Sequence, residues 1–201
     1  MQQEVKSELS KQQILESAFK LFYENGFKAT SINNIMETTS LTKGAFYYHY
    51  KTKKELGLEI ISQKLKKRVT DAMILPLSNK GDALEILENT FLNRIKSFPT
   101  YSKLHGCPLN NFINEIGDYE PSYQTALKDI IETWKSALIT LIERGKLENS
   151  IQKNISSSAV AIYLISAFEG IRGIRKVYTD DGILEDYLLG LKLFLQQLKK
   201  Q

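Results

Sequence analysis

A helical spacing of apolar residues runs through almost the whole chain and limits it to an all-helical fold. The first clear example is a set of five residues at intervals of three and four, namely Ile14, Leu15, Ala18, Phe19 and Phe22. No stretch of any length alternates apolar and polar residues as a strand does, and the sequence has no internal repeat. The sequence therefore predicts an all-α protein.

Capping residues and helix breakers divide this pattern into separate helices. Ser10 is expected to cap the first helix, and Asn25-Gly26 to end it with a left-handed turn. Thr52 and Glu55 form a capping box that opens a long helix toward residue 75, where Pro76 stops it. Later helices are expected at about residues 82–97, 106–117, 121–144, 156–178 and 183–198.

The single cysteine and the polar start of the chain bear on where the protein works. Cys107 excludes a disulfide within the chain and fits a reducing compartment. Residues 1–10 lack the apolar core of a signal peptide, and the longest nearly apolar run, 159–168, is too short to span a bilayer. We expect a cytoplasmic protein with no membrane partner.

Positive charge is concentrated in the first third of the chain. The formal net charge is +4, but residues 1–68 hold 12 Lys and Arg against 7 Asp and Glu, whereas the remainder holds 15 against 16. Such an excess favours a polyanionic partner, although a solvated surface produces the same clustering.

Two short helices joined by a tight turn are expected at residues 32–38 and 43–49, after the first helix. In a three-helix head of this kind, the second helix of the pair enters the major groove of DNA. The start of that helix is small or polar, and Gly44 lets the backbone approach the base edges. Phe46 and Tyr50, four residues apart, are expected to face the core.

Hydroxyl, imidazole and ammonium groups follow on the same segment and suit contacts with phosphates, which position a protein on DNA. Three donors are expected on the phosphate side of the helix, namely Tyr47, Tyr48 and His49. Three lysines follow directly, namely Lys51, Lys53 and Lys54. The pattern predicts a helix-turn-helix that binds double-stranded DNA.

Three runs carry a resemblance to a known family. They are Gly26-Phe27-Lys28-Ala29-Thr30-Ser31-Ile32, then Ile35-Met36, and then the run from Leu41 through Thr42-Lys43-Gly44-Ala45-Phe46-Tyr47-Tyr48-His49-Tyr50 to Leu56. Over about residues 10–58 the chain resembles the N-terminal domain of TetR-family transcriptional regulators. Tyr50 stands where the family more often has Phe, which leaves its packing role intact.

The resemblance implies an all-helical homodimer that represses transcription by binding a palindromic operator. It implies a helix-turn-helix domain, which we place at residues 1–55, and a larger effector-binding and dimerisation domain at residues 56–201. A small-molecule effector of unknown identity is expected to shift the fourth helix, separate the two heads and release the DNA. The last two helices are expected to form the dimer interface.

Ten DNA-contacting residues are carried over by position. The resemblance assigns base contacts or close approach to Thr42, Lys43, Gly44 and Ala45. It assigns phosphate contacts to Thr30, Ser31, Tyr47, Tyr48, His49 and Lys53.

The later helices offer a candidate effector pocket, although the same apolar stripes serve plain packing. Its candidate residues are Leu87, Phe91, Cys107, Phe112, Trp134, Leu138, Tyr163 and Phe168. Cys107 lies in a Gly-Cys-Pro-Leu run that some family members share. It has three interpretations: a buried apolar residue, a residue of the effector pocket, or a thiol that senses oxidants or electrophiles.

Small residues and a broad leucine stripe mark the last two helices as a candidate dimer interface, although an intramolecular core has the same pattern. The candidates are Ala159, Ser166, Gly170, Tyr187, Leu188, Leu191 and Leu195.

Two other classes of function compete with DNA binding. An enzyme is not expected, because the chain lacks a nucleophile elbow, a P-loop, an HExxH pair and a dinucleotide fingerprint. No cofactor is expected, and His105 with Cys107 is too small a set for a metal site. A helical interaction adaptor without DNA affinity is the second class, and the basic excess at residues 1–68 argues against it.

Overall fold

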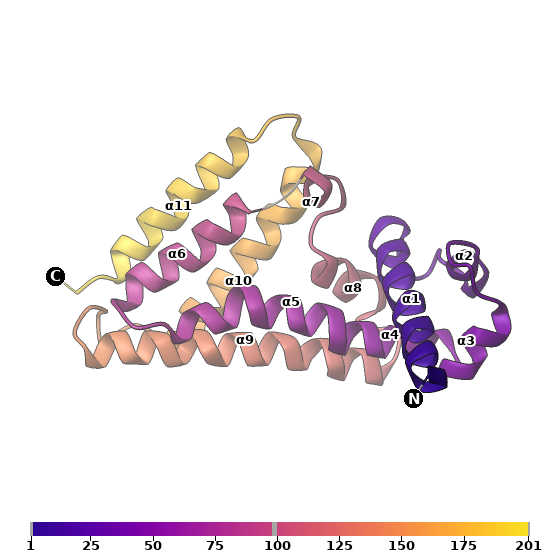
Figure 1. Cartoon of the computed structure of the whole chain (residues 1–201). Helices are drawn as coiled ribbons and strands as arrows, with labels where there is room; N and C mark the ends of the chain where they lie inside the picture. Colours follow the sequence, from indigo (N-terminus) through magenta and orange to yellow (C-terminus); the bar gives the residue numbers. More distant parts are fainter. Residues whose placement is uncertain (1, 98–99, 201) are drawn as a thin grey trace. The chain divides into compact units, whose positions relative to one another are not determined.

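The computed structural model describes residues 2–97 and 100–200, with the backbone alone for residues 2 and 100–102. The described part is helical and contains no β-strand (Figure 1), only a single antiparallel bridge between Ile151 and Lys199. The all-α class predicted from the sequence is confirmed.

The helices follow the predicted order, except that α7 (Thr100–His105), between the predicted helices at residues 82–97 and 106–117, was not predicted. The N-terminal helices are α1 (Gln2–Asn25), α2 (Ile32–Glu37), α3 (Lys43–His49) and α4 (Lys53–Ile60). The helical path continues through the π-helical η1 (Ile61–Lys66), α5 (Lys67–Val69), the π-helical η2 (Thr70–Ile74) and the 3-10 turn η3 (Leu75–Ser78). The rest are α6 (Ala83–Lys96), α7 (Thr100–His105), α8 (Pro108–Ile116), α9 (Pro121–Leu147), α10 (Ser157–Ile174), η4 (Arg175–Val177) and α11 (Gly182–Leu198).

The chain forms two compact units, each built from two segments. The head unit comprises Met1–Lys67 and Pro108–Lys128. The other unit comprises Arg68–Cys107 and Asp129–Gln201, and we call it the sensor unit because the effector is expected to bind there. The boundary expected near residue 55 stays a prediction about domains. The division of the chain into compact units places α8 and the first turns of α9 in the same unit as the helix-turn-helix.

Aromatic rings form the centre of the head unit. Phe22 of α1 and Phe27 of the following loop lie with ring centroids 4.8 Å apart, and Phe112 of α8 lies 6.2 Å from each. Tyr123 of α9 meets Phe27 edge-on at 5.6 Å. A Cβ at Gly57 would lie 2.9 Å from Phe27 Cε2, so only glycine lets α4 approach these rings so closely.

The first helix begins earlier than expected. α1 starts at Gln2, and Ser10 lies inside it rather than at its cap. The Ser10 hydroxyl donates to the Ser7 carbonyl at 2.8 Å, a hydrogen bond to the preceding turn that serine side chains commonly make inside helices. Ser10 is therefore a half-buried residue inside a long helix, and the expectation of a cap there is wrong.

The sensor unit has its own aromatic core. Phe91 of α6, Trp134 of α9 and Phe168 of α10 are all buried, and their ring centroids lie 5.5 to 6.4 Å apart. Edge-to-face pairs such as Phe91 with Phe168 and Trp134 with Phe168 are a favoured geometry for buried rings.

The helical stretch Ser157–Val177 is longer than the apolar run noted in the sequence. By length and composition alone it reaches what a bilayer span requires, with a mean hydropathy of 1.2, and half of it is buried inside the protein. Such burial is also typical of the core helix of a folded domain.

Candidate nucleic-acid interface

Side-chain caps position the two short helices. Ser31 caps α2, with its Oγ accepting the Asn34 amide at 3.1 Å and the Asn34 side chain accepting the Ser31 amide at 2.9 Å. Thr52 caps α4 by accepting the Glu55 amide at 3.2 Å, and the Glu55 carboxylate accepts the Lys51 amide at 2.8 Å. These caps fix the backbone on either side of α3.

The third helix has one buried side and one exposed side. Phe46 and Tyr50 are buried as predicted, with ring centroids 5.7 Å apart. Tyr47 and Tyr48 are 57 % and 75 % exposed. Burying two aromatic side chains anchors the helix, so the neighbouring two tyrosines are held at the surface.

The start of α3 lies open at the surface. Thr42, Lys43 and Gly44 are exposed, and a Cβ at Gly44 would meet only the Thr42 hydroxyl, at 3.6 Å. Thr42 has the extended backbone of an N-cap but makes no side-chain cap hydrogen bond, so its hydroxyl is available to a ligand. The first turn of α3 can therefore approach another macromolecule closely.

A hollow of about 490 Å³ separates α3 from the N-terminal turns of α1. Ala45, Tyr48 and Leu41 line one wall. The other wall is made by α1 residues, namely Gln3, Lys6, Ser7, Leu9, Ser10 and Gln13. The sequence reading missed the early members of this set because it started the helix at Ser10.

His49 joins α3 to α1. Its Nε2 lies 2.7 Å from the Ser10 hydroxyl, which makes a hydrogen bond between the two helices. Burial, and then the charge of Lys11, lowers the pKa of His49 below its usual value. The surroundings of His49 in the head unit therefore favour the neutral imidazole over the charged one.

Lys53 lies against the aromatic core. Its ammonium is 4.4 Å from the Phe27 ring centroid and 5.7 Å from that of Phe22, within the range of cation–π attraction. Burial lowers the pKa of Lys53. The side chain therefore contributes to packing as well as to the positive charge of the head unit.

Thr30 and Ser31 differ in exposure. Thr30 is 2 % exposed and its hydroxyl donates to the Gly26 carbonyl at 2.8 Å, so this hydroxyl faces the interior. Ser31 is exposed at the start of α2. Of the two, only Ser31 has an exposed side chain, and its hydroxyl donates to Asn34 Oδ1 at 2.6 Å.

The structure brings together part of the candidate effector set. Leu87 and Leu138 are fully buried in the sensor unit, as are the ring-cluster residues Phe91, Trp134 and Phe168. Cys107 is 3 % exposed.

Two other members of that set lie elsewhere. Phe112 packs in the head unit against Phe22 and Phe27. Tyr163 is 54 % exposed, with its ring centroid 4.5 Å from that of Phe194.

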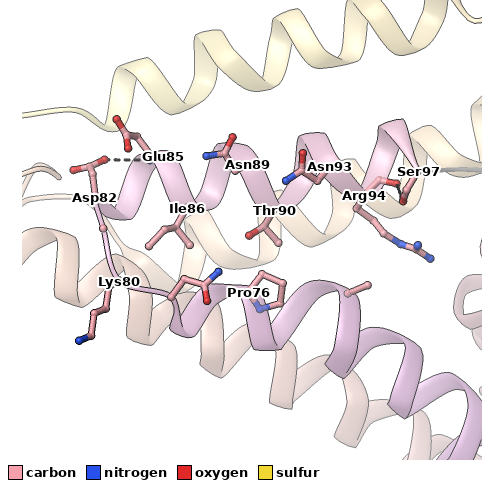
Figure 2. Close-up of a pocket in the computed structure, with 13 residues that line it drawn as sticks. Pro76, Lys80, Asp82, Glu85, Ile86, Asn89, Thr90, Asn93, Arg94 and Ser97 are labelled. Carbon is pink, nitrogen blue, oxygen red and sulfur yellow. Dashed lines mark hydrogen bonds between the residues drawn. The ribbon is translucent and has the colours of Figure 1, made fainter.

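A groove of about 500 Å³, lined mostly by residues of polar types, runs between α6 and the η2–η3 segment (Figure 2). Ile86 and Thr90 point from α6 toward Pro76, and Arg94 lies at the opposite end from Lys80 and Asp82. None of the residues predicted for the effector pocket lines this groove. The sequence reading missed it because its α6 face is mostly polar.

The candidate dimer residues divide between the surface and the interior. Ala159, Ser166 and Gly170 of α10 are exposed, and Tyr187 and Leu188 of α11 are half-buried. Leu191 and Leu195 are buried within the chain.

Apolar residues that were not among these candidates are also exposed on or next to α10, η4 and α11, and we call them the exposed apolar face. They are Ile162, Tyr163, Ile174, Val177, Tyr178, Leu189 and Leu193. Leucines occur on both sides of α11, so the sequence did not distinguish its outer stripe from its inner one.

Comparison with known proteins gives two family matches. The family described as "Bacterial regulatory proteins, tetR family" matches residues 14–60, which contain α2, α3 and α4. The family described as "Tetracyclin repressor-like, C-terminal domain" matches residues 83–188, about half of the chain.

Curated relatives are transcriptional regulators. The chain is 28% identical over 177 residues to an uncharacterized HTH-type transcriptional regulator of Lactococcus lactis, covering 88% of both chains. It is 23% identical to the HTH-type transcriptional repressor DhaR of Mycobacterium sp., covering 89% of this chain and 88% of that one. The HTH-type transcriptional regulator QacR of Staphylococcus aureus is 44% identical over 52 residues, 26% of this chain and 28% of that protein.

Solved structures share the fold. A TetR-family regulator from Cytophaga hutchinsonii superposes with a TM-score of 0.85 at 21% identity, covering 98% of both chains. A TetR regulator from Chloroflexus aurantiacus gives a TM-score of 0.85 at 22% identity, covering 96% of this chain and 98% of that one. With these two family matches, the chain belongs to the TetR family of DNA-binding transcriptional regulators.

Proposed function

We propose that the protein is a repressor that binds a palindromic operator as a homodimer and leaves it when a small-molecule effector binds. The observation that carries the proposal is the exposed first turn of α3, held in place by the buried Phe46 and Tyr50. A helix anchored in this way fits the major groove, which admits one α-helix.

Base recognition is assigned to the first turn of α3. Thr42 and Lys43 offer a hydroxyl and an ammonium to base edges, and Gly44 permits close approach of the backbone. Ala45 faces the hollow beside α1, where its methyl group suits an apolar contact.

Phosphate contacts are assigned to the exposed hydroxyls of Ser31, Tyr47 and Tyr48. The Thr30 hydroxyl is buried, and His49 is hydrogen-bonded to Ser10. These contacts support positioning roles for Thr30 and His49. Lys53 keeps its charge close to the head surface while it packs on Phe27, so it adds to the attraction for DNA.

The homodimer is supported by the exposed apolar face of α10, η4 and α11. Val177 is 83 % exposed and Leu189 is 60 % exposed, although both are apolar. Gly170 and Gly190 have no atom within 4 Å of a built Cβ, so a second backbone can approach them. In a two-fold symmetric dimer, the same face of a second copy of the chain would cover this apolar face.

Burial of Cys107 favours its interpretation as a packed residue of the sensor unit. A thiol that senses electrophiles needs exposure, and Cys107 is 3 % exposed. We therefore propose small-molecule control in preference to redox control, in the cytoplasm and without a membrane partner.

The test is a mobility-shift titration with the DNA upstream of the protein's own gene, combined with equilibrium sedimentation. We expect one retarded species with two protomers on each duplex, and a dimer at micromolar concentration without DNA. Absence of affinity for any duplex at low ionic strength would contradict the DNA-binding proposal and favour the adaptor. A monomer at micromolar concentration would contradict the homodimer alone.

A further inference from the structure

The groove between α6 and η2–η3 contains a threonine whose side chain faces it. Thr90 is only 6 % exposed, and it points from α6 toward Pro76 on the opposite wall (Figure 2). Its hydroxyl makes no hydrogen bond with any other described residue. A polar group that is nearly buried and has no partner is unfavourable, so a ligand that bonds this hydroxyl is favoured in the groove.

Threonines elsewhere in the chain show how a helix satisfies such a hydroxyl. In α9, Thr125, Thr133 and Thr140 each donate to the carbonyl four residues earlier, over 2.8, 2.7 and 3.0 Å. Thr90 lies in the middle of α6 and does not make this bond with the Ile86 carbonyl. Its hydroxyl is therefore available to a molecule that occupies the groove.

Amide side chains line the same groove. Asn89 and Asn93 are exposed, lie one turn apart on α6, and make no hydrogen bond within the described part of the chain. Asn79, which follows η3, adds a third amide. Each amide donates and accepts hydrogen bonds, as does the Thr90 hydroxyl. A ligand that matches this set donates and accepts at several neighbouring points, as a molecule with several hydroxyl groups does.

The ionised residues that line the groove balance in formal charge. Lys80 and Arg94 are cations, and Asp82 and Glu85 are anions. The Asp82 carboxylate also caps α6 by accepting the amides of Leu84 and Glu85, at 2.9 and 3.1 Å. The lining therefore carries no net formal charge that would attract an anion or a cation, which favours a neutral ligand.

The apolar part of the groove is aliphatic. Ile86 is buried on α6, and Ala72 and Pro76 belong to the η2–η3 segment. None of the 13 lining residues is aromatic, so the groove offers no ring on which a flat aromatic ligand would stack. Aliphatic side chains suit the C–H surface of a saturated ring. The volume of about 500 Å³ is within the range of small-molecule sites.

We propose that this groove is the effector site and that the effector is a small, neutral, polyhydroxylated molecule, a sugar or a cyclic polyol. The inference rests on the proposed control by an effector, to which it adds a site and a ligand class. In the complex, one ligand hydroxyl bonds the Thr90 hydroxyl, and neighbouring hydroxyls bond Asn89 and Asn93. The carbon skeleton packs against Ile86 and Pro76.

The groove is connected along the chain to the DNA-binding helices. Its η2–η3 wall continues the helical path that starts at α4, directly after α3. A ligand that contacts both α6 and this wall favours the conformations in which the two are held at one separation. Binding in the groove is therefore expected to act on the helix-turn-helix through α4.

The test measures binding of neutral probes to the full-length protein by calorimetry and by the shift in melting temperature. The probes are glucose, galactose, maltose and myo-inositol. Two compounds serve for comparison: cyclohexanol, which keeps a saturated ring with a single hydroxyl, and glucuronate, which adds a carboxylate. We expect at least one neutral probe to bind saturably and to raise the melting temperature, and to bind more tightly than either comparison compound.

Two variants locate the binding in the groove. Thr90→Val replaces the hydroxyl by a methyl group at little change in shape, and Asn93→Ala shortens an exposed side chain. Each is expected to weaken binding of that probe by about tenfold, because a ligand hydroxyl loses its partner. Thr140→Val and Asn154→Ala make the same changes at exposed positions outside the groove and should retain the wild-type affinity.

The inference is overturned if none of the four neutral probes binds saturably, if cyclohexanol or glucuronate binds as tightly, or if affinity is unchanged in both Thr90→Val and Asn93→Ala. Mobility shifts with operator DNA on the same samples separate this result from the proposed function. DNA binding without probe binding contradicts this inference alone. Probe binding that depends on Thr90 but does not release DNA supports the site and the ligand class, and it overturns the effector role.

Discussion

The Glu115 carboxylate of α8 accepts the backbone amide of Phe27 at 2.7 Å, and its second oxygen accepts the amide of Lys28. Gly26, just before them, has a φ of +91°, and a Cβ there would lie 3.1 Å from both Glu115 oxygens. One carboxylate thus fixes the loop between α1 and α2. Cys107 is the last residue of one segment of the sensor unit, and Glu115 follows it by eight residues. The short helix α8 therefore connects that segment, along the chain, to the carboxylate that holds this loop.

The first prediction concerns Glu115. Replacing it by Ala leaves two backbone amides without their charged acceptor and should lower the free energy of unfolding by about 1–3 kcal/mol. Urea denaturation measures the loss, and Glu132→Ala is the control, because the ion pair between Glu132 and Lys135 is long, at 3.9 Å, and lies on a helix surface. Equal stability of the two variants would show that the loop does not depend on Glu115.

The second prediction concerns pH. Burial and Lys11 lower the pKa of His49, against the opposing charges of Glu8 and Glu59. Folding therefore favours the neutral imidazole, so its stabilisation is complete above the ordinary value of 6.5 and is lost as the pH falls through the lowered folded-state value. Unfolding free energies measured from neutral to mildly acid pH should fall in the wild type.

The variant His49→Gln should show a smaller loss over the same acid range, because it removes the titrating group and can still bond Ser10. His105→Gln serves as the control for loss of a histidine outside the contact between α1 and α3. An identical profile for His49→Gln and the wild type would rule out His49 as the source of the acid sensitivity.

The third prediction concerns the exposed apolar face. Leu189→Lys places a charge on α11 where a second copy is proposed, and desolvating that charge should convert the dimer to a monomer at micromolar concentration. Leu147→Lys changes an even more exposed leucine at the end of α9 and should leave the dimer intact. Sedimentation that finds both variants dimeric would place the interface on another surface.

The fourth prediction concerns the salt dependence of DNA binding. Tyr48→Ala removes a neutral phosphate donor, so affinity should fall while the salt slope stays close to that of the wild type. Lys43→Ala removes an ammonium assigned to base edges, so it should weaken binding to the operator more than binding to other duplexes. Lys153→Ala, in an exposed loop of the sensor unit, should change neither quantity. Unchanged affinity in both α3 variants would be incompatible with the proposed contacts.

The local design of the head could be read from the sequence. The four-residue spacing of Phe46 and Tyr50 predicts their common burial, and the intervening Tyr47 and Tyr48 are accordingly exposed. Such spacing is sufficient because one turn of helix decides which side chains share a face.

Features that depend on distant partners were not predictable. The Thr30 hydroxyl turns inward because it satisfies the Gly26 carbonyl, and Glu115 reaches a loop that precedes it by 87 to 88 residues. On α11, apolar residues occupy both faces, so the burial of Leu191 and the exposure of Leu189 depend on which helices pack against it. Periodicity identifies a helix with two apolar faces but does not orient it.

Methylation protection on operator DNA tests most directly whether α3 occupies the major groove. Dimethyl sulfate modifies guanine N7 in the major groove and adenine N3 in the minor groove, so it reports each groove separately. We predict protection of guanine N7 in two half-sites one helical turn or a multiple of it apart, about 34 Å for a single turn, with loss of that protection in Lys43→Ala. Protection confined to adenine N3, or bound DNA with every guanine N7 still reactive, would contradict the account.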